Sequence, residues 1–174
     1  MDQNPSSSLP PLPPSAASDL PVLPSVLPLR EGRFSGRGEF AELIRQALAA
    51  AANQGWREII LCDADFDDWP LGERSVVESL NHWSKTGRKL TLLAGSYATI
   101  MRRHARFVSW RHTWSHLIEC RGASGVSGVD LPSALWSPAW VFERLDHEHC
   151  TGIAGSEAVR RVALKERLAE RSKV

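Results

Sequence analysis

The chain has 174 residues, 43% of them hydrophobic, and its 21 Lys and Arg residues nearly balance its 20 Asp and Glu residues, which leaves a net charge of +1. This length suits one well-buried core and is short for two domains, and the balanced charge gives no overall attraction to nucleic acid or to anionic lipid. Three widely spaced Cys form no disulfide framework, and no apolar run approaches the roughly 20 residues of a membrane span.

The first 32 residues are predicted to be a disordered Pro-rich tail. Eight of the eleven prolines lie among residues 1–30, and proline removes backbone donors that helices and sheets require. The segment 9–14 has the composition of a polyproline II ligand and equally of a spacer. The chain shows no secretory signal, and its unpaired Cys suit a reducing compartment, so we expect a cytoplasmic protein without a membrane association.

Residues 33–174 are predicted to form a single α/β domain. Apolar residues at helical spacing alternate with short runs of β-branched and leucine residues. Because connections of helix length join the successive strands, this order predicts βαβ units and a mainly parallel central sheet flanked by helices. The predicted elements are a helix over 40–51, a strand over 57–62, a helix over 76–83, a strand over 89–94, a helix over 97–114 and a strand over 117–121.

The C-terminal part of the domain is predicted to contain shorter strands. Residues 122–128 have the composition of a loop, and strands are expected at 134–135 and 140–145. Residues 146–149 are expected to turn between the last strands, and residues 156–172 to form a closing helix.

Four carboxylates lie within six residues directly after the strand at 57–62. An acidic cluster at the carboxyl end of a strand lies where open α/β sheets bind ligands. Asp63 and Asp65 alternate along an extended chain, so both could contact one hard cation such as Mg²⁺. The alternative is a structural cluster, in which Asp67 or Asp68 caps the next helix and the others accept backbone or arginine hydrogen bonds.

Residues 97–116 contain four arginines and no acidic residue, which makes them the strongest local positive patch. This patch could bind phosphates, or its arginines could pair with acidic side chains on neighbouring elements. Trp110 and Trp114 lie on the same predicted helix, where core packing competes with base stacking as their role. The four arginines are Arg102, Arg103, Arg106 and Arg111.

Three segments resemble an uncharacterised bacterial domain family that also occurs fused to acetyltransferase domains and is similar to half of a phospholipase D-like fold. They are IILCDADFD at 59–67, RRHARFVSWR at 102–111 and WSHLIECR at 114–121. The resemblance covers residues 34–168 and implies a phospholipase D-like domain, but the family has no assigned activity. Phospholipase D chemistry needs a His-x-Lys pair, which the corresponding stretch LWSPAW at 135–140 lacks. The resemblance therefore implies the fold without the catalyst.

A strand followed by Asp63-x-Asp65 also resembles the first motif of haloacid-dehalogenase-type phosphohydrolases. That resemblance implies Asp63 as nucleophile and Asp65 as general acid/base. The family also uses a Ser or Thr after a later strand and a Lys, for which Ser96 and either Lys85 or Lys89 are available. No acidic pair follows the third strand, so the catalytic set is incomplete.

Histidines form two weaker patterns. His112 and His116 have the i, i+4 spacing of a zinc-binding pair, but a third ligand and the glutamate of an HExxH motif are missing. His147, His149 and Cys150 lie in or beside the predicted turn. We therefore predict neither a metal nor a cofactor.

The leading hypothesis is a non-catalytic module that binds a protein partner or a small anionic ligand at the carboxyl edge of its sheet. Self-association through a sheet edge is a further form of partner binding. The alternatives are a Mg²⁺-dependent phosphohydrolase using Asp63 and Asp65, and nucleic-acid binding through the Arg-rich helix, against which the balanced net charge argues. The predicted ligand-binding residues are Asp63, Asp65, Asp67, Arg102, Arg103 and Arg106.

Overall fold

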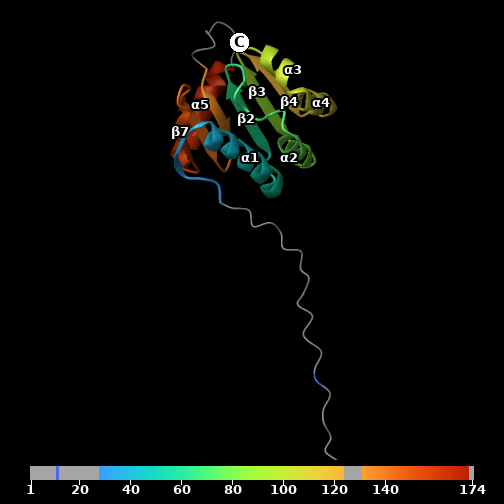
Figure 1. Cartoon of the computed structure of the whole chain (residues 1–174), viewed down its shortest axis with the longest axis horizontal. Coiled ribbons are helices and arrows are strands. Elements are labelled where there is room, and N and C mark those ends of the chain that lie inside the picture. The colour runs from blue at the N-terminus through green and yellow to red at the C-terminus, as the bar shows by residue number, and fades with distance from the viewer. Residues whose placement is uncertain (1–10, 12–27, 124–130, 173–174) are drawn as a thin grey trace, which may run out of the picture.

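The computed structural model describes residue 11, residues 28–123 and residues 131–172. Within these residues, seven strands form one sheet and five helices pack against it (Figure 1). The strands are β1 (Gly32–Ser35), β2 (Glu58–Asp63), β3 (Lys89–Ala94), β4 (Ile118–Gly122), β5 (Ser133–Trp136), β6 (Val141–Asp146) and β7 (Thr151–Gly155). The helices are α1 (Arg37–Gln54), α2 (Arg74–Ser84), α3 (Ala98–Arg103), α4 (Ala105–Thr113) and α5 (Ala158–Arg171).

The sheet is mixed and mostly antiparallel, so the predicted mainly parallel sheet is wrong. Its order is β1-β7-β6-β5-β2-β3-β4, in which β2, β3 and β4 are parallel and the other four pairings are antiparallel. The parallel part follows from the helical crossovers between those strands. In contrast, β5, β6 and β7 are joined by the short connections 137–140 and 147–150, which allow antiparallel pairing alone. The predicted turn at 146–149 is present there.

The helix predicted over residues 97–114 is two helices, α3 and α4, that meet at His104. The backbone of His104 leaves the helical region, with φ −115° and ψ 52°. Its ring is buried and its Nε2 donates a hydrogen bond to the carbonyl oxygen of Phe66 at 2.9 Å. A tertiary contact therefore sets this break, which helical periodicity in the sequence does not reveal.

The two faces of the sheet carry unequal helical layers. Helices α1 to α4 cover one face, where α1 and α2 pack against each other, and α5 alone covers part of the other (Figure 1). Alternate strand residues supply both cores, so Ile59 and Leu61 face α1 and α2, whereas Ile60 and Cys62 face α5. None of the described helices is both long and apolar enough to span a membrane.

The predicted tail and the predicted loop at 122–128 lie mostly outside the described residues. Residues at the end of the tail contact the fold. The carbonyl oxygen of Arg30 accepts a hydrogen bond from Trp140 Nε1 at 3.0 Å, and Glu31 accepts one from the backbone N–H of Ser156 at 3.0 Å. Gly32 is the first residue of β1.

A bidentate ion pair links α1 to the start of α2, and we expect it to make the stability of the fold depend on pH. Arg45 donates from Nε and Nη2 to the two carboxylate oxygens of Glu73 at 2.7 and 2.8 Å, and these hydrogen bonds lower the pKa of Glu73. Because a lowered pKa stabilises the fold above the unfolded value of about 4.3, Glu73→Gln should cost up to about 1 kcal/mol at pH 7. Urea unfolding at pH 7 and pH 3 checks this, since the cost should be smaller at pH 3, where Glu73 begins to be protonated; an equal cost at both would contradict it.

Candidate functional site

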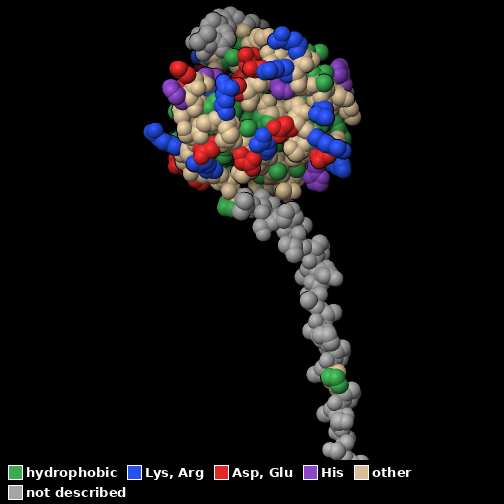
Figure 2. All heavy atoms as spheres, viewed as in Figure 1, with side chains coloured by type: hydrophobic (Ala, Val, Ile, Leu, Met, Phe, Trp, Pro, Cys, Tyr) green, Lys and Arg blue, Asp and Glu red, His purple; other side chains and the backbone are tan. Residues whose placement is uncertain are grey.

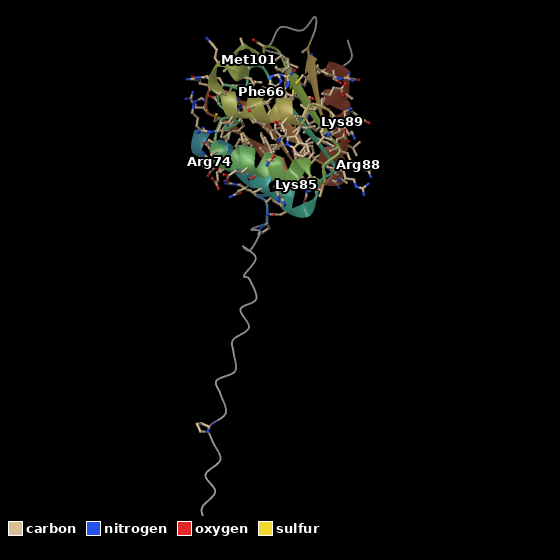
Figure 3. All side chains as sticks on the ribbon, turned by 90° about the vertical axis from the view of Figure 1, so that its right-hand side faces the viewer. Phe66, Arg74, Lys85, Arg88, Lys89 and Met101 are labelled. Carbon is tan, nitrogen blue, oxygen red and sulfur yellow. The ribbon has the colours of Figure 1, made fainter. Side chains whose placement is uncertain are left out.

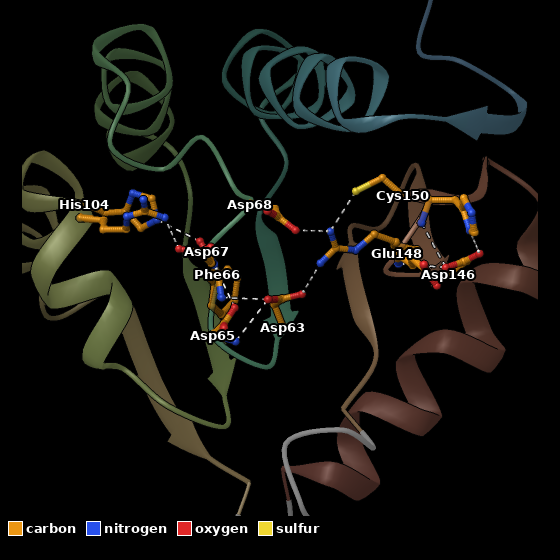
Figure 4. A network of polar contacts seen from close by, with 12 residues as sticks. Asp63, Asp65, Phe66, Asp67, Asp68, His104, Asp146, Glu148 and Cys150 are labelled. Atoms are coloured by element: carbon orange, nitrogen blue, oxygen red, sulfur yellow. Dashed lines mark hydrogen bonds and ion pairs between the residues drawn. The ribbon is translucent and has the colours of Figure 1, made fainter.

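Two carboxylates of the acidic cluster, Asp63 and Asp68, contact a buried arginine on β6. Figure 4 labels both of them, together with Cys150 on the other side of the network. Arg144 donates from Nη2 to Asp63 Oδ1 at 3.2 Å and from Nη1 to Asp68 Oδ2 at 3.0 Å. The same Nη1 lies 3.2 Å from the Sγ of Cys150, and the guanidinium carbon lies 4.4 Å from the centre of the Phe40 ring. The side chains of Asp63 and Arg144 are each only 2% exposed.

This buried arginine remains charged. Burial lowers the pKa of Arg144, but the hydrogen bond to Cys150 and the charges of Asp63 and Asp68 together raise it above its ordinary value. A buried charge needs partners of opposite sign, and two carboxylates supply them here. The geometry therefore supports the structural interpretation of Asp63 and Asp68.

The oxygens of Asp63 are occupied within the fold. Its Oδ1 accepts from Arg144, and its Oδ2 accepts from the backbone N–H groups of Asp65 and Phe66 at 3.2 and 2.8 Å. A nucleophile or Mg²⁺ ligand needs an accessible oxygen, so this arrangement gives the phosphohydrolase hypothesis no support. Within residues 28–123 and 131–172, no group of three or more His, Cys, Asp or Glu side chains is arranged to hold a metal.

The network fixes residues 64–72, here called the acidic loop. Phe66 has a φ of 59°, in the left-handed region that a bulky residue rarely adopts. The N–H of Phe66 donates a hydrogen bond to Asp63, and its carbonyl oxygen accepts one from His104. The Phe66 ring packs against that of Trp69, with ring centroids 4.9 Å apart. These contacts stabilise the strained residue and leave Asp65 and Asp67 exposed at the surface of the loop.

The predicted site residues divide between the acidic loop and the two helices beside it. Arg103 forms an ion pair with Asp67, and Arg106 Nη1 donates to the carbonyl oxygen of Gly72 at 3.2 Å. Arg102 is exposed and has no ion pair among the described residues. The structure therefore brings Asp67, Arg103 and Arg106 to one surface, whereas Asp63 lies buried at the end of β2, paired with Arg144.

A groove of about 520 Å³ separates α2 from α4 and was not identified from the sequence. Trp110 is buried, and its Nε1 donates to Ser84 Oγ at 3.0 Å, so its packing role is confirmed. Trp114 is half-buried, and its Nε1 donates across the groove to Asn81 Oδ1 at 3.0 Å. The groove is lined by Arg74, Val77, Glu78, Asn81, Arg106, Ser109, Thr113, Trp110 and Trp114.

The charge on the helical layer is uneven. Figure 2 shows positive and negative side chains interspersed on the face where α1 lies. In contrast, α3 and α4 with the residues that flank them carry four arginines and no carboxylate. Figure 3 turns α2 toward the viewer, with Arg74 at its start and Lys85 just after its end. We call the outer surface of α2, α3 and α4 the basic surface; its cationic residues are Arg74, Lys85, Arg102, Arg103, Arg106 and Arg111.

Comparison with known proteins finds a likeness in structure alone. No protein-family model matches the chain, and no curated protein matches it. Eight chains of solved structures match, among them TrmBL2, an archaeal chromatin protein described as showing a novel mode of DNA binding. That match has a TM-score of 0.61 at 16% sequence identity.

The match covers 86% of this chain and 55% of the TrmBL2 chain, so this chain spans about half of that protein's length. At this identity the likeness concerns the fold. It corrects the predicted phospholipase D-like fold, because this mixed, mostly antiparallel sheet resembles that of TrmBL2.

Proposed function

We propose that this domain binds nucleic acid through the basic surface. The observation that carries the proposal is the run of residues 97–116, in which four arginines lie on two adjacent helices without a carboxylate among them. The planar guanidinium group of arginine matches the oxygens of a phosphate and can bind two of them at once. The description of TrmBL2 as a DNA-binding chromatin protein is consistent with the proposal.

The arginines differ in how free they are to contact phosphate. Arg102 has no ion pair among the described residues, and Arg106 uses one Nη1 bond to a backbone carbonyl. Arg103 pairs with Asp67 at the surface, and an exposed pair of this kind contributes little and exchanges readily for another anion. The contacts are to the phosphate backbone, so we expect binding that depends little on base sequence.

A small anionic ligand at the carboxyl edge is less well supported. Asp63 is committed to Arg144, so it offers no ligand contact. Asp65 and Asp67 are exposed there and would repel an anion. Helices α3 and α4 carry no carboxylate of their own, and the acidic neighbours Asp67 and Glu78 are each paired with an arginine of the basic surface. This difference favours a polyanion bound along α3 and α4.

The test compares two double variants of the full chain by fluorescence anisotropy with a labelled oligonucleotide. Arg102→Ala/Arg106→Ala should weaken binding by about 100-fold or more, because each substitution removes a charge-assisted hydrogen bond to phosphate worth about 1.5 kcal/mol or more. It should also reduce the slope of log affinity against log salt by about 0.7–0.9 for each phosphate that the variant no longer neutralises. Arg33→Ala/Arg37→Ala removes the same charge from exposed residues in β1 and at the start of α1 and should have little effect. Equal weakening in both variants, or binding that ignores salt, would reject the basic surface as the site.

A further inference from the structure

The α2–α4 groove combines an apolar floor with a polar rim that carries two arginines and one carboxylate, that of Glu78. Trp114 is half-buried and supplies the aromatic surface, whereas Trp110 is buried. Both indole N–H groups are already bonded within the protein, that of Trp110 to Ser84 and that of Trp114 to Asn81. Their rings are therefore held in place without help from a ligand. What Trp114 offers a ligand is apolar ring surface, and aromatic rings of this kind stack with nucleobases whatever the base.

The rim carries groups that suit the sugar–phosphate part of a nucleotide. Arg106 lines the groove and uses one of its guanidinium nitrogens on the carbonyl oxygen of Gly72. Arg74 pairs with Glu78 at 3.2 Å, but both side chains are more than two-thirds exposed, so the pair is weak and a phosphate can displace it. The volume of about 520 Å³ lies within the range of about 300–1,000 Å³ usual for small-ligand sites.

A double helix cannot use this combination. Its bases are stacked inside the duplex and present their edges alone in the grooves, so a duplex contacts the basic surface through phosphates. A single strand presents both phosphates and unstacked bases. The groove therefore adds binding free energy for a single strand that a duplex does not gain.

We infer that the α2–α4 groove receives unpaired bases and that the domain prefers single-stranded to double-stranded nucleic acid. This inference depends on the proposed function, because the strand must first be held by the arginines of the basic surface. Trp114 is the stacking residue, and Arg74 and Arg106 position the neighbouring phosphates.

The experiment compares three oligonucleotides of equal length by anisotropy with the full chain: a thymidine homopolymer, a strand of abasic analogues with the same phosphates, and a duplex. We expect the homopolymer to bind at least about tenfold more tightly than the abasic strand and the duplex, since one stacked base is worth that much. Trp114→Ala should abolish this difference and Trp114→Phe should keep most of it, while thermal unfolding confirms that both variants are folded.

The outcomes separate this inference from the proposed function. Equal binding of all three oligonucleotides, weakened alike by Arg102→Ala/Arg106→Ala, would overturn the inference and leave phosphate binding in place. A preference for the single strand that survives Trp114→Ala in a folded protein would remove the groove as its origin. Binding of none of them would overturn both.

Discussion

Replacing Arg144 with Met is expected to lower the free energy of unfolding by about 3–5 kcal/mol, the usual cost of removing one partner from a buried ion pair. Met has a similar length and keeps the packing against Phe40, so the destabilisation comes from charge. The buried carboxylate of Asp63 would then have no cation beside it, and Asp68 would also lose its ion pair with Arg144. For a domain of this size the melting temperature should fall by roughly 10 °C, which calorimetry or urea unfolding measures.

Arg103→Met is the matched control, because it also breaks an Arg–Asp pair but an exposed one. Its cost should stay below about 1 kcal/mol. Adding Asp63→Asn to Arg144→Met should recover part of the stability, since the uncompensated charge is then gone. If Arg144→Met costs no more than Arg103→Met, the carboxylates of the cluster are solvated and the buried network is not what holds the acidic loop.

The parallel half of the sheet could be predicted from the sequence because its strands have a clear local pattern. β2 and β3 are continuous apolar runs, as buried parallel strands are, and a helix of clear periodicity lies between them. The strands β1 and β7 have no such pattern, since Gly32–Ser35 is short and Thr151–Gly155 contains two glycines. Packing, and not strand propensity, selects those residues, so β1 and β7 were not given bounds from the sequence. The strands at 134–135 and 140–145 and the turn at 146–149 were predicted and correspond to β5, β6 and the β6–β7 connection, but the mixed order of the whole sheet was not.

The candidate site shows the same division between local and long-range information. The carboxylates are adjacent in sequence, and their role as hydrogen-bond acceptors at a strand end was one of the two interpretations. Their partner Arg144 comes from β6, 81 residues after Asp63. One signal was present: Arg144 alternates with Phe142, so a charged side chain falls on the inward face of a strand. The pairing of Arg103 with Asp67 was likewise among the alternatives, whereas the groove depends on how α2 meets α4 and has no local signature.

Substituting Ala for Gly152 is expected to cost more than about 3 kcal/mol, because over-packing a rigid site exceeds the usual range of about 1–3 kcal/mol. Gly152 lies in β7 between β1 and β6, opposite Phe34 on one side and Arg144 on the other. A Cβ there would lie 2.1 Å from the carbonyl oxygen of Glu143 and 2.5 Å from Cζ of Phe34. The obstacle includes backbone, so relief requires the pairing of β6 and β7 to shift, and urea unfolding measures the destabilisation.

Gly38→Ala is the matched control, in which the same chemical change should raise the free energy of unfolding. Gly38 lies in the first turn of α1, where a Cβ would meet nothing within 4 Å. Ala favours the helix and restricts the unfolded chain, so this variant should gain about 0.5–1 kcal/mol. A Gly152→Ala protein as stable as the parent would show that β7 does not pair with β6 and β1 in this register. Because that register also sets β7 beside Arg144, the result would remove the support for the contact between Arg144 and Cys150 as well.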